Sequence, residues 1–253
     1  MRVVMISDLH LGAPYMTLAH LDEIIARAQT LAPDLIALTG DLAPGPSLVR
    51  TRTPPLEAIA SRLARLTAPQ GVYAVLGNHD WWLDEAAQAR QSGPIEIQEA
   101  LEATGIPVLA NQALALANGV WLAGLDSQEA IRIDHLTSIG KDDLEATLAQ
   151  VPDGPDLILL AHEPHIFAEM PERVSLTLSG HTHGGQLRLF GWAPILPRTI
   201  DRSYVYGHIT RGDQHLVVSA GLGYSKIPLR VGTPPEITVI DLQAERDENA
   251  PAR

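Results

Sequence analysis

The 253-residue sequence has no cysteine and only two lysines, Lys141 and Lys226. Without cysteine, the chain has no thiolate nucleophile, no cysteine-ligated zinc, no iron–sulfur cluster and no disulfide. The sequence also lacks any run of apolar residues near the roughly 20 that a membrane-spanning helix requires. Residues 157–161, for example, form an apolar run that has only the length of a strand. These absences exclude thiol chemistry and an integral membrane segment in this sequence.

Positive charge is also scarce, because 18 Lys and Arg residues stand against 30 Asp and Glu residues and give a net charge of −12 with neutral His. This balance argues against the basic face of a nucleic-acid-binding protein and against loose attachment to an anionic membrane. An anionic substrate would need attraction from something other than side-chain charge. Met1 leads directly into the apolar residues 3–6, which leaves no room for a signal peptide. We therefore expect a cytoplasmic protein, or one peripheral to the membrane if a preceding anchor is missing from this sequence.

Strand-like and helix-like segments alternate in the first half of the chain, which is typical of an α/β fold. The spacing predicts helices at residues 19–31, 56–66, 95–104 and 142–150, and strands at residues 3–6, 35–38, 72–76, 107–109, 113–117, 120–125, 157–161, 174–178, 204–210, 216–219 and 237–242. We find neither a repeat nor a linker, so we expect one domain over residues 1–253 with a frayed polar tail at residues 244–253. Two sheets with helices outside would accommodate this order.

Aspartates and histidines gather immediately after predicted strands. They are found in five places: Asp8-x-His10, Gly40-Asp41, Gly77-Asn78-His79-Asp80, His162 and Gly180-His181-Thr182-His183. Open α/β folds bind ligands at this edge of the sheet, and glycines allow the backbone to approach closely there. Carboxylate and imidazole donors suit divalent first-row metals such as Mn, Fe or Zn. The patterns G-N-H-[DE] and G-H-x-H each have a chance probability below roughly 0.01 at average composition. Their joint occurrence predicts a metal site.

In this order, these residues resemble the signature of the calcineurin-like metallophosphoesterases. Residues 180–186 (GHTHGGQ) and 221–240 (GLGYSKIPLRVGTPPEITVI) are similar to a bacterial subgroup of membrane-associated phosphodiesterase-like proteins. The resemblance extends over about residues 2–242. It implies a four-layer αββα sandwich, in which two mixed sheets are flanked by helices and a two-metal site lies at the C-terminal ends of strands. Many subgroup members carry an N-terminal membrane helix or export signal, and this sequence has none.

The resemblance also assigns the ligands of two divalent metal ions to residues of this chain. One metal position would take Asp8, His10, Asp41 and His183. The other would take Asp41, Asn78, His162 and His181, so that Asp41 bridges the two. Two cations roughly 3.5–4 Å apart need a shared oxygen donor, which a carboxylate supplies. Because only two carboxylates face two divalent ions, the site stays positive and is able to attract a small phosphate ester.

His79 lies within the motif without being one of these ligands, which makes it the candidate catalytic residue. It would bind a phosphate oxygen and protonate the leaving alkoxide, with Asp80 orienting its ring. The attacking group would be a hydroxide that bridges the metals and displaces the leaving oxygen in line. Asn78, His79 and Arg188 are the residues that we expect to contact the substrate. Neither a G-x-S-x-G sequence nor a P-loop is present, which removes two common hydrolase alternatives.

Several residues near the motifs have an ordinary structural explanation beside a functional one. Asp80 is also a candidate helix cap. Trp81 and Trp82 either wall the pocket or pack under the loop. His165 either supports His162 or simply starts a helix.

The loops around the motifs raise the same question. Arg50 and Arg52, in the loop after Asp41, either hold an anionic group of the substrate or are solvated charges. Residues 190–206 are apolar, aromatic and proline-rich. We expect them to form a loop that borders the site and shapes the choice of leaving group.

The sequence thus predicts a dinuclear metal-dependent phosphoesterase. The subgroup resemblance favours a phosphodiester or pyrophosphate bond over a free monoester. A lipid-linked substrate such as UDP-diacylglucosamine is one form of this, beside a soluble nucleotide or phosphodiester metabolite, and no nucleic-acid partner is expected. Two alternatives stay open: a non-catalytic metal-binding scaffold on the same fold, and a metal hydrolase of C–N or ester bonds.

Overall fold

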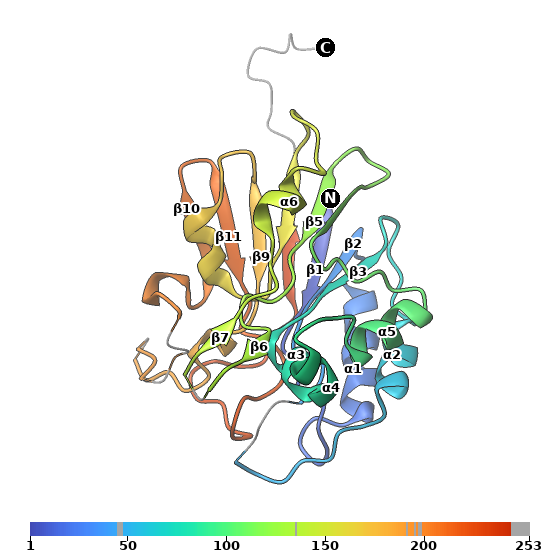
Figure 1. Cartoon of the computed structure of the whole chain (residues 1–253), viewed down its shortest axis with the longest axis vertical. Coiled ribbons are helices and arrows are strands. Elements are labelled where there is room, and N and C mark those ends of the chain that lie inside the picture. Colours follow the sequence, from blue (N-terminus) through green and yellow to red (C-terminus); the bar gives the residue numbers. More distant parts are fainter. Residues whose placement is uncertain (45–47, 135, 191, 195, 197–198, 244–253) are drawn as a thin grey trace.

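The computed structural model describes residues 1–44, 48–134, 136–190, 192–194, 196 and 199–243, and its first main sheet has the strand order β12-β1-β2-β3 (Figure 1). The strands are β1 (Arg2–Ile6), β2 (Leu35–Thr39), β3 (Val72–Val75) and β12 (Thr238–Asp241). β1, β2 and β3 are parallel, and β12 pairs antiparallel with β1. Because three strands run in one direction, their C-terminal ends meet at one edge of the sheet.

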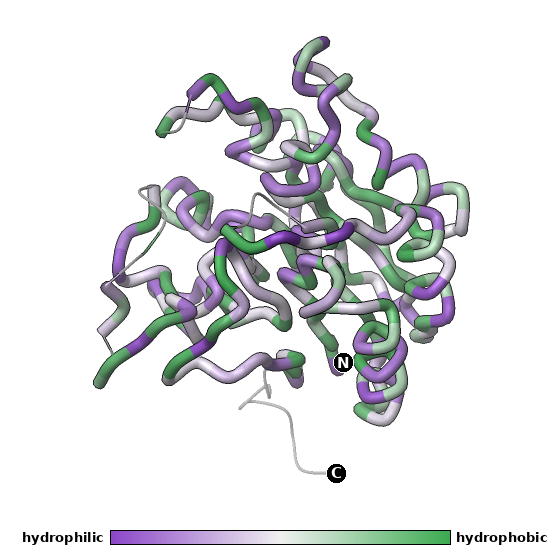
Figure 2. Tube along the Cα trace, turned by 90° about the horizontal axis from the view of Figure 1, so that it is seen from below, coloured by the Kyte–Doolittle hydropathy of each residue, from purple (hydrophilic) through white to green (hydrophobic). Residues whose placement is uncertain are grey.

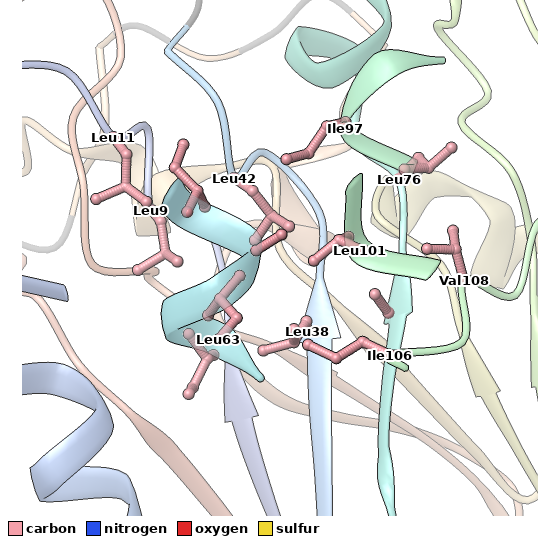
Figure 3. Packing of buried hydrophobic residues seen from close by; sticks show 14 of the residues in the cluster. Leu9, Leu11, Leu38, Leu42, Leu63, Leu76, Ile97, Leu101, Ile106 and Val108 are labelled. Atoms are coloured by element: carbon pink, nitrogen blue, oxygen red, sulfur yellow. The ribbon is translucent and has the colours of Figure 1, made fainter. Parts of the chain in front are cut away.

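Helices cover the outer face of this sheet. They are α1 (Leu18–Thr30), α2 (Leu56–Leu63), α3 (Asn78–Leu83), α4 (Glu85–Arg90) and α5 (Glu96–Ala103). Leu38 of β2 packs in one buried cluster with Leu63 of α2 and Leu101 of α5 (Figure 3). Full burial of such a side chain contributes roughly 1.5–3 kcal/mol. This cluster therefore holds the helices against the sheet that presents the first motifs.

The second main sheet has the strand order β10-β11-β9-β8-β5-β4. Its strands are β4 (Gln112–Ala115), β5 (Trp121–Gly124), β8 (Leu157–Leu160), β9 (Leu176–Ser179), β10 (Gly207–Arg211) and β11 (Gln214–Val218). β5, β8, β9 and β11 are parallel to their neighbours, and β4 and β10 form antiparallel edges. The outer face is covered by α6 (Leu144–Leu148) and the 3-10 helix η1 (Pro164–Glu169), and a separate small sheet pairs β6 (Ile131–Arg132) with β7 (Ser138–Ile139).

Alternating side chains in the strands explain why the two sheets stack. Val4 of β1 faces the cluster under the helices, whereas Met5 belongs to a cluster between the sheets. In β8, Leu159 faces the helices of the second layer and Ile158 faces the other sheet. Successive residues of a strand point to opposite faces, so both sheets bury both faces. The fold is the predicted α/β four-layer αββα sandwich, and apolar stretches (green) run through the interior of the trace in Figure 2.

Two segments differ from the sequence prediction. Residues 107–109 form no strand, and Val108 instead makes an isolated bridge to Ala74. The segment Asn78–Leu83, for which the sequence pattern predicts no helix, is the short helix α3. Asp80 explains this helix start, because its carboxylate accepts a hydrogen bond from the Gly77 backbone N–H. Within the described ranges, no helix has the length and apolar character needed to cross a membrane.

Candidate metal centre

All seven predicted ligands lie just beyond the C-terminal ends of strands. They are Asp8 and His10 after β1, Asp41 after β2, Asn78 after β3, His162 after β8, and His181 and His183 after β9. The two sheets meet here, because the His181 backbone N–H donates a hydrogen bond of 3.0 Å to Asp8 Oδ1. The site therefore lies at a common edge of both sheets, near α3 in Figure 1.

The backbone is strained at most of these ligands. Positive φ angles are found at Asp8 (52°), His10 (44°), Asp41 (54°), His181 (68°) and His183 (53°). The left-handed region costs a non-glycine residue on the order of 1–2 kcal/mol, and such strain is concentrated at functional sites. In these strained turns, the five side chains point toward the same site, which is the structural result of the unfavourable backbone angles.

Two motif glycines are required by close packing around the carboxylates. A Cβ at Gly77 would collide with the carboxylate of Asp41, and a Cβ at Gly180 would collide with the hydroxyl of Ser7 and the carboxylate of Asp8. Any larger residue at either position would push a predicted ligand out of place. This explains why the ligand motifs after β3 and β9 begin with glycine.

Asp8, His10 and His183 form the first buried cluster, and their ligand atoms lie within 4.8 Å of one another. Nε2 of His183 lies 3.0 Å from Nε2 of His10 and 3.5 Å from Oδ1 of Asp8. The hydroxyl of Ser7 donates to the other Asp8 oxygen at 2.5 Å. Burial raises the pKa of Asp8 to about 6. A cation beside Asp8 would offset this burial penalty on its charge.

Asp41, His162 and His181 form a second buried cluster of the same size. Oδ2 of Asp41 lies 3.2 Å from Nε2 of His162 and 3.4 Å from Nε2 of His10, which belongs to the first cluster. Oδ1 of Asn78 lies 3.1 Å from Nδ1 of His181. One oxygen of Asp41 thus stands between histidines of both clusters, where the sequence prediction places a bridging ligand.

The atoms of His162 provide a test of whether these residues fit a metal ion. Its Nδ1 lies 2.6 Å from the Thr39 carbonyl oxygen and donates to it, so that in the neutral ring the lone pair is on Nε2, 3.2 Å from Asp41 Oδ2. That Nε2 atom is buried without a hydrogen-bond partner, a costly condition for a polar atom. A divalent cation would satisfy both it and the carboxylate. The oxygen and imidazole donors of the two clusters are consistent with a dinuclear metal site.

The pKa shifts follow from burial and from the Asp41–His162 pair. Burial alone would raise the pKa of Asp41, but the charge of His162 helps to lower it well below its usual range. Burial alone would lower the pKa of His162, but Asp41 raises it far above its usual value. Burial lowers the pKa of His10 to about 3, and it also lowers the pKa of His181 and of His183. Neutral imidazole is the form that binds a metal.

His79 stands beside both clusters. Its backbone N–H donates to Oδ1 of Asp41 at 2.9 Å. Its ring lies 4.8 Å from the His10 ring at 87°, and 4.9 Å from the ring of Trp82. Nδ1 of His79 is buried without a hydrogen-bond partner. The ring is therefore close enough to the ligand cluster to meet a group bound there.

Asp80 has a different set of partners from the one expected. Its carboxylate accepts hydrogen bonds from the backbone N–H groups of Asp41 (2.8 Å), Leu42 (2.9 Å), Ala43 (3.0 Å) and Gly77 (3.0 Å). In the part of the chain that the structure describes, no hydrogen bond joins it to the ring of His79. The reason is that four backbone donors already occupy both oxygens. Asp80 therefore acts on the site by fixing the turn that carries Asp41.

Of the two neighbouring tryptophans, Trp81 lies in the core and Trp82 lies beside the site. Trp81 is buried, and its Nε1–H donates to Asp126 Oδ1 at 2.7 Å. Trp82 packs beside His79 and carries the guanidinium of Arg132 4.0 Å above its ring. His165, the candidate support for the ligand on β8, is half-buried within η1. Trp82 is thus the tryptophan that borders the site.

The three arginines considered from the sequence lie in loops. Arg188 places its guanidinium 5.6 Å from the ring centre of Tyr206. Arg50 and Arg52 are exposed, and the backbone of Arg52 forms a bridge with Ala13. A role of any of them in substrate binding stays a prediction.

Two charged residues that the sequence reasoning did not single out approach the histidine ligands. Nη2 of Arg230 lies 3.2 Å from Nδ1 of His183, and Oε1 of Glu129 lies 3.9 Å from Nε2 of His181. Arg230 belongs to the segment 221–240 that resembles the phosphodiesterase-like subgroup, which is the one signal that pointed to it. Glu129 follows no recognisable motif, so only the tertiary structure reveals it.

A small pocket opens to solvent beside His10 and His79 and is bordered by Tyr15, Tyr224 and Lys226. The loop at residues 190–206 lies partly outside the described residues, at 191, 195 and 197–198. Its described end contacts the GHTHGGQ segment, because the Thr182 hydroxyl donates to the carbonyl oxygen of Val205 at 2.6 Å. The described end of this loop therefore lies beside the segment that carries His181 and His183, as expected for a loop that borders the site.

Two stacked sheets between helices, with two neighbouring buried His/Asp clusters at the strand ends, define an α/β protein with a candidate metal centre. Residues 1–185 match the family described as "Calcineurin-like phosphoesterase", and the chain belongs to this family. It is 34% identical over 246 residues to the "Uncharacterized metallophosphoesterase YkuE" of Bacillus subtilis. The aligned region covers 96% of this chain and 79% of that protein. An "Uncharacterized metallophosphoesterase" of Aquifex aeolicus is 30% identical, with 96% and 85% covered.

Similar domains are also found in longer proteins and in solved structures. The "Transmembrane protein with metallophosphoesterase domain" of Danio rerio is 31% identical over 96% of this chain, which spans 53% of that protein. The crystal structure of a Thermus thermophilus protein, TT1561, covers 87% of this chain and 89% of its own, with a TM-score of 0.51 and 14% identity. At this identity, the structural likeness supports the fold alone.

Proposed function

We propose that this metallophosphoesterase is a dinuclear hydrolase of phosphodiester or pyrophosphate bonds. The position of Asp41 supports this most strongly, because its Oδ2 lies 3.4 Å from Nε2 of His10 and 3.2 Å from Nε2 of His162. A carboxylate oxygen between two histidine clusters is what a two-ion centre requires. One ion would be held by Asp8, His10, Asp41 and His183, and the other by Asp41, Asn78, His162 and His181.

When bound, two divalent ions supply positive charge that attracts a phosphate group and stabilises the charge developing on it. The hydrogen bond from the His79 N–H to Asp41 holds the His79 ring next to that charge. We assign His79 to bind a phosphate oxygen and to protonate the leaving oxygen. Burial lowers the pKa of His79, and an anionic phosphate beside the ring would raise it again. Asn78 and Arg188 are the other proposed substrate contacts.

The pocket beside His10 and His79 supports a substrate with a second substituent on phosphorus. A phosphodiester or diesterified pyrophosphate carries a second group on the attacked phosphorus, whereas a monoester carries only one, so the former needs more room beside the metal centre. Tyr15, Tyr224 and Lys226 border this pocket, which is open to solvent. Aromatic walls and a cation suit an organic group that carries a further negative charge.

Exposed apolar side chains support a lipid-linked form of this substrate. Leu189, Phe190 and Trp192 are all exposed in the loop that continues from the GHTHGGQ segment. Large exposed apolar groups gathered on one loop are a feature of surfaces that bind apolar partners. A soluble nucleotide or another phosphodiester metabolite is the competing form, and a comparison of substrates distinguishes them.

The proposal is tested with metal-stripped protein supplied with Mn²⁺, Fe²⁺ or Zn²⁺. We expect the metal to restore hydrolysis of bis-p-nitrophenyl phosphate, and to do so better than hydrolysis of p-nitrophenyl phosphate. UDP-linked lipids, cyclic nucleotides and nucleotide diphosphates are then compared at equal concentration. Protein that binds the metals but cleaves none of these esters would be a metal-binding scaffold, and the enzymatic proposal would be wrong.

A further inference from the structure

Each of the four histidine ligands has one ring nitrogen directed into the cluster and one directed away. The inward atoms are Nε2 of His10, Nε2 of His183, Nε2 of His162 and Nδ1 of His181. Their outward nitrogens have unlike surroundings. His162 faces the Thr39 carbonyl oxygen, and His10 has no hydrogen-bond partner on its outward Nδ1. His181 faces Glu129, whereas His183 faces Arg230.

An outward acceptor matters because a neutral imidazole that binds a metal through one nitrogen carries its proton on the other. A carbonyl or carboxylate at that proton fixes the tautomer and makes the inward nitrogen a stronger donor. His162 has such an acceptor at 2.6 Å. His181 has the Glu129 carboxylate at 3.9 Å, and its Nε2 is otherwise buried without a hydrogen-bond partner. The Glu129 carboxylate therefore lies near the outward nitrogen of His181 and attracts its proton electrostatically, at a distance longer than a direct hydrogen bond.

Glu129 is held in this place by the surrounding chain. Its side chain is only 15% exposed. The Thr199 hydroxyl donates to its Oε1 at 2.6 Å, and Nε1 of Trp82 donates to its backbone carbonyl at 2.9 Å. Its backbone N–H donates to the Ser127 hydroxyl at 3.1 Å. These contacts fix a carboxylate at the edge of the ligand cluster.

The charges of the two ligand sets explain why a carboxylate is useful on this side. The set that contains Asp8 has a carboxylate of its own besides the shared Asp41, and Arg230 lies behind its His183. The set that contains Asn78 has only the shared carboxylate. Glu129 lies behind the His181 of that second set. The outer charges therefore compensate for the unequal charges of the two ligand sets. The cation Arg230 lies beside the set with two carboxylates, and the anion Glu129 lies beside the set with one.

We infer that Glu129 is a positioning residue that holds His181 with Nδ1 toward the metal and supplies negative charge to the Asn78 side of the centre. The inference rests on the proposed dinuclear function, and it names a residue that no ligand motif includes. Removal of the charge in Glu129→Gln should weaken binding of one of the two ions by roughly 10–100-fold, the effect typical of a lost outer partner. The ion on the Asp8 side should keep its affinity.

The test titrates Mn²⁺ into metal-stripped full-length protein and measures affinities by calorimetry, and the pairing of the ions by electron paramagnetic resonance. At Mn²⁺ concentrations that fill both positions of the original protein, Glu129→Gln should lose the signal of a coupled pair and show that of a single ion. Thr199→Val, which removes the hydroxyl bound to Glu129, should weaken the same ion by a smaller factor. Glu99→Gln, which removes the same charge from an exposed position on α5, is the matched control.

Thermal unfolding of the metal-free variants checks that each is folded. Unchanged affinities in Glu129→Gln would overturn the inference, and so would an equal loss in Glu99→Gln, since net charge alone would then explain it. If the original protein binds no Mn²⁺, the metal centre and the proposed function both fail. If it binds two ions and cleaves no ester, the proposed function fails while the role of Glu129 stands or falls on its own affinities.

Discussion

The backbone N–H of His79 donates a hydrogen bond of 2.9 Å to Oδ1 of Asp41, while Oδ2 of the same carboxylate faces the histidines of both clusters. Asp41 thus fixes the position of the candidate catalytic residue through one oxygen and joins the two candidate metal positions through the other. A displacement of this single side chain would affect both ions and the proton donor together.

His79→Gln should lower the hydrolysis rate by roughly 10²–10⁴-fold, the usual contribution of a positioned acid or base. The metal content should stay unchanged, because His79 is assigned no role as a ligand. Steady-state kinetics with bis-p-nitrophenyl phosphate and elemental analysis measure the two quantities. His79 also belongs to a third group of possible ligand atoms with His10 and Asp41. A loss of metal in this variant would therefore make His79 a ligand and remove its assignment as the acid.

Asp41→Asn should remove metal from both positions, since a neutral amide replaces the only carboxylate shared by the two clusters. The amide oxygen is still able to accept the His79 N–H, so the turn should remain folded. The bound metal per chain, measured by elemental analysis after purification, should fall toward zero. Loss of only one ion would contradict the bridging role, and Asp8→Asn, which alters one ligand set alone, provides the comparison.

Asp80→Asn should lower the free energy of unfolding, and should not act on the hydrolysis rate alone. The amide group would face backbone N–H donors that now bond to the carboxylate, and each buried donor left unpaired costs roughly 1–3 kcal/mol. Urea unfolding of both proteins measures this free energy. Asp143→Asn is the control, because the Asp143 side chain accepts the Ala146 N–H as the N-cap of α6, and Asn caps helices equally well. Unchanged stability, together with a shifted pH–rate profile, would instead favour the direct role for Asp80 expected from the sequence.

Asp126→Asn should remove part of the pH dependence of stability. Burial raises the pKa of Asp126 to about 6, from an ordinary value of 3.8. Because the folded state then binds the proton more tightly than the unfolded chain, the stability contributed by this group is complete below pH 3.8 and is lost as pH rises through 6. Between about pH 4 and pH 6, the original protein should lose up to about 3 kcal/mol relative to the variant.

The asparagine oxygen still accepts the Trp81 Nε1–H, so the two proteins should be of similar stability near pH 4. Urea unfolding at about pH 4, 5, 6 and 7.5 gives the difference at each pH. A difference that does not change over this range would mean that Asp126 titrates normally in the folded protein.

The sequence alone determined the architecture and the composition of the site. The order of strand-like and helix-like segments predicts two sheets with helices outside, and the family resemblance predicts the four-layer sandwich. The residues just after the strands supply carboxylates and imidazoles, and parallel strands must end at the same edge. The glycines at 77 and 180 mark the positions where the backbone approaches those carboxylates. All of these depend on local patterns and on the geometry of a sheet, which the sequence contains directly.

Only the tertiary structure decided which neighbouring groups support that site. The sequence cannot tell that Asp80 bonds to the turn after β2 instead of to His79, because that choice depends on where two separate turns meet. The same holds for Trp81 in the core against Trp82 at the site, and for Glu129 and Arg230 behind His181 and His183. These contacts join segments that are distant along the chain, and the packing of whole layers sets their distances. The sequence could therefore place the candidate ligands at one edge of the sheets, but it could not identify their outer partners.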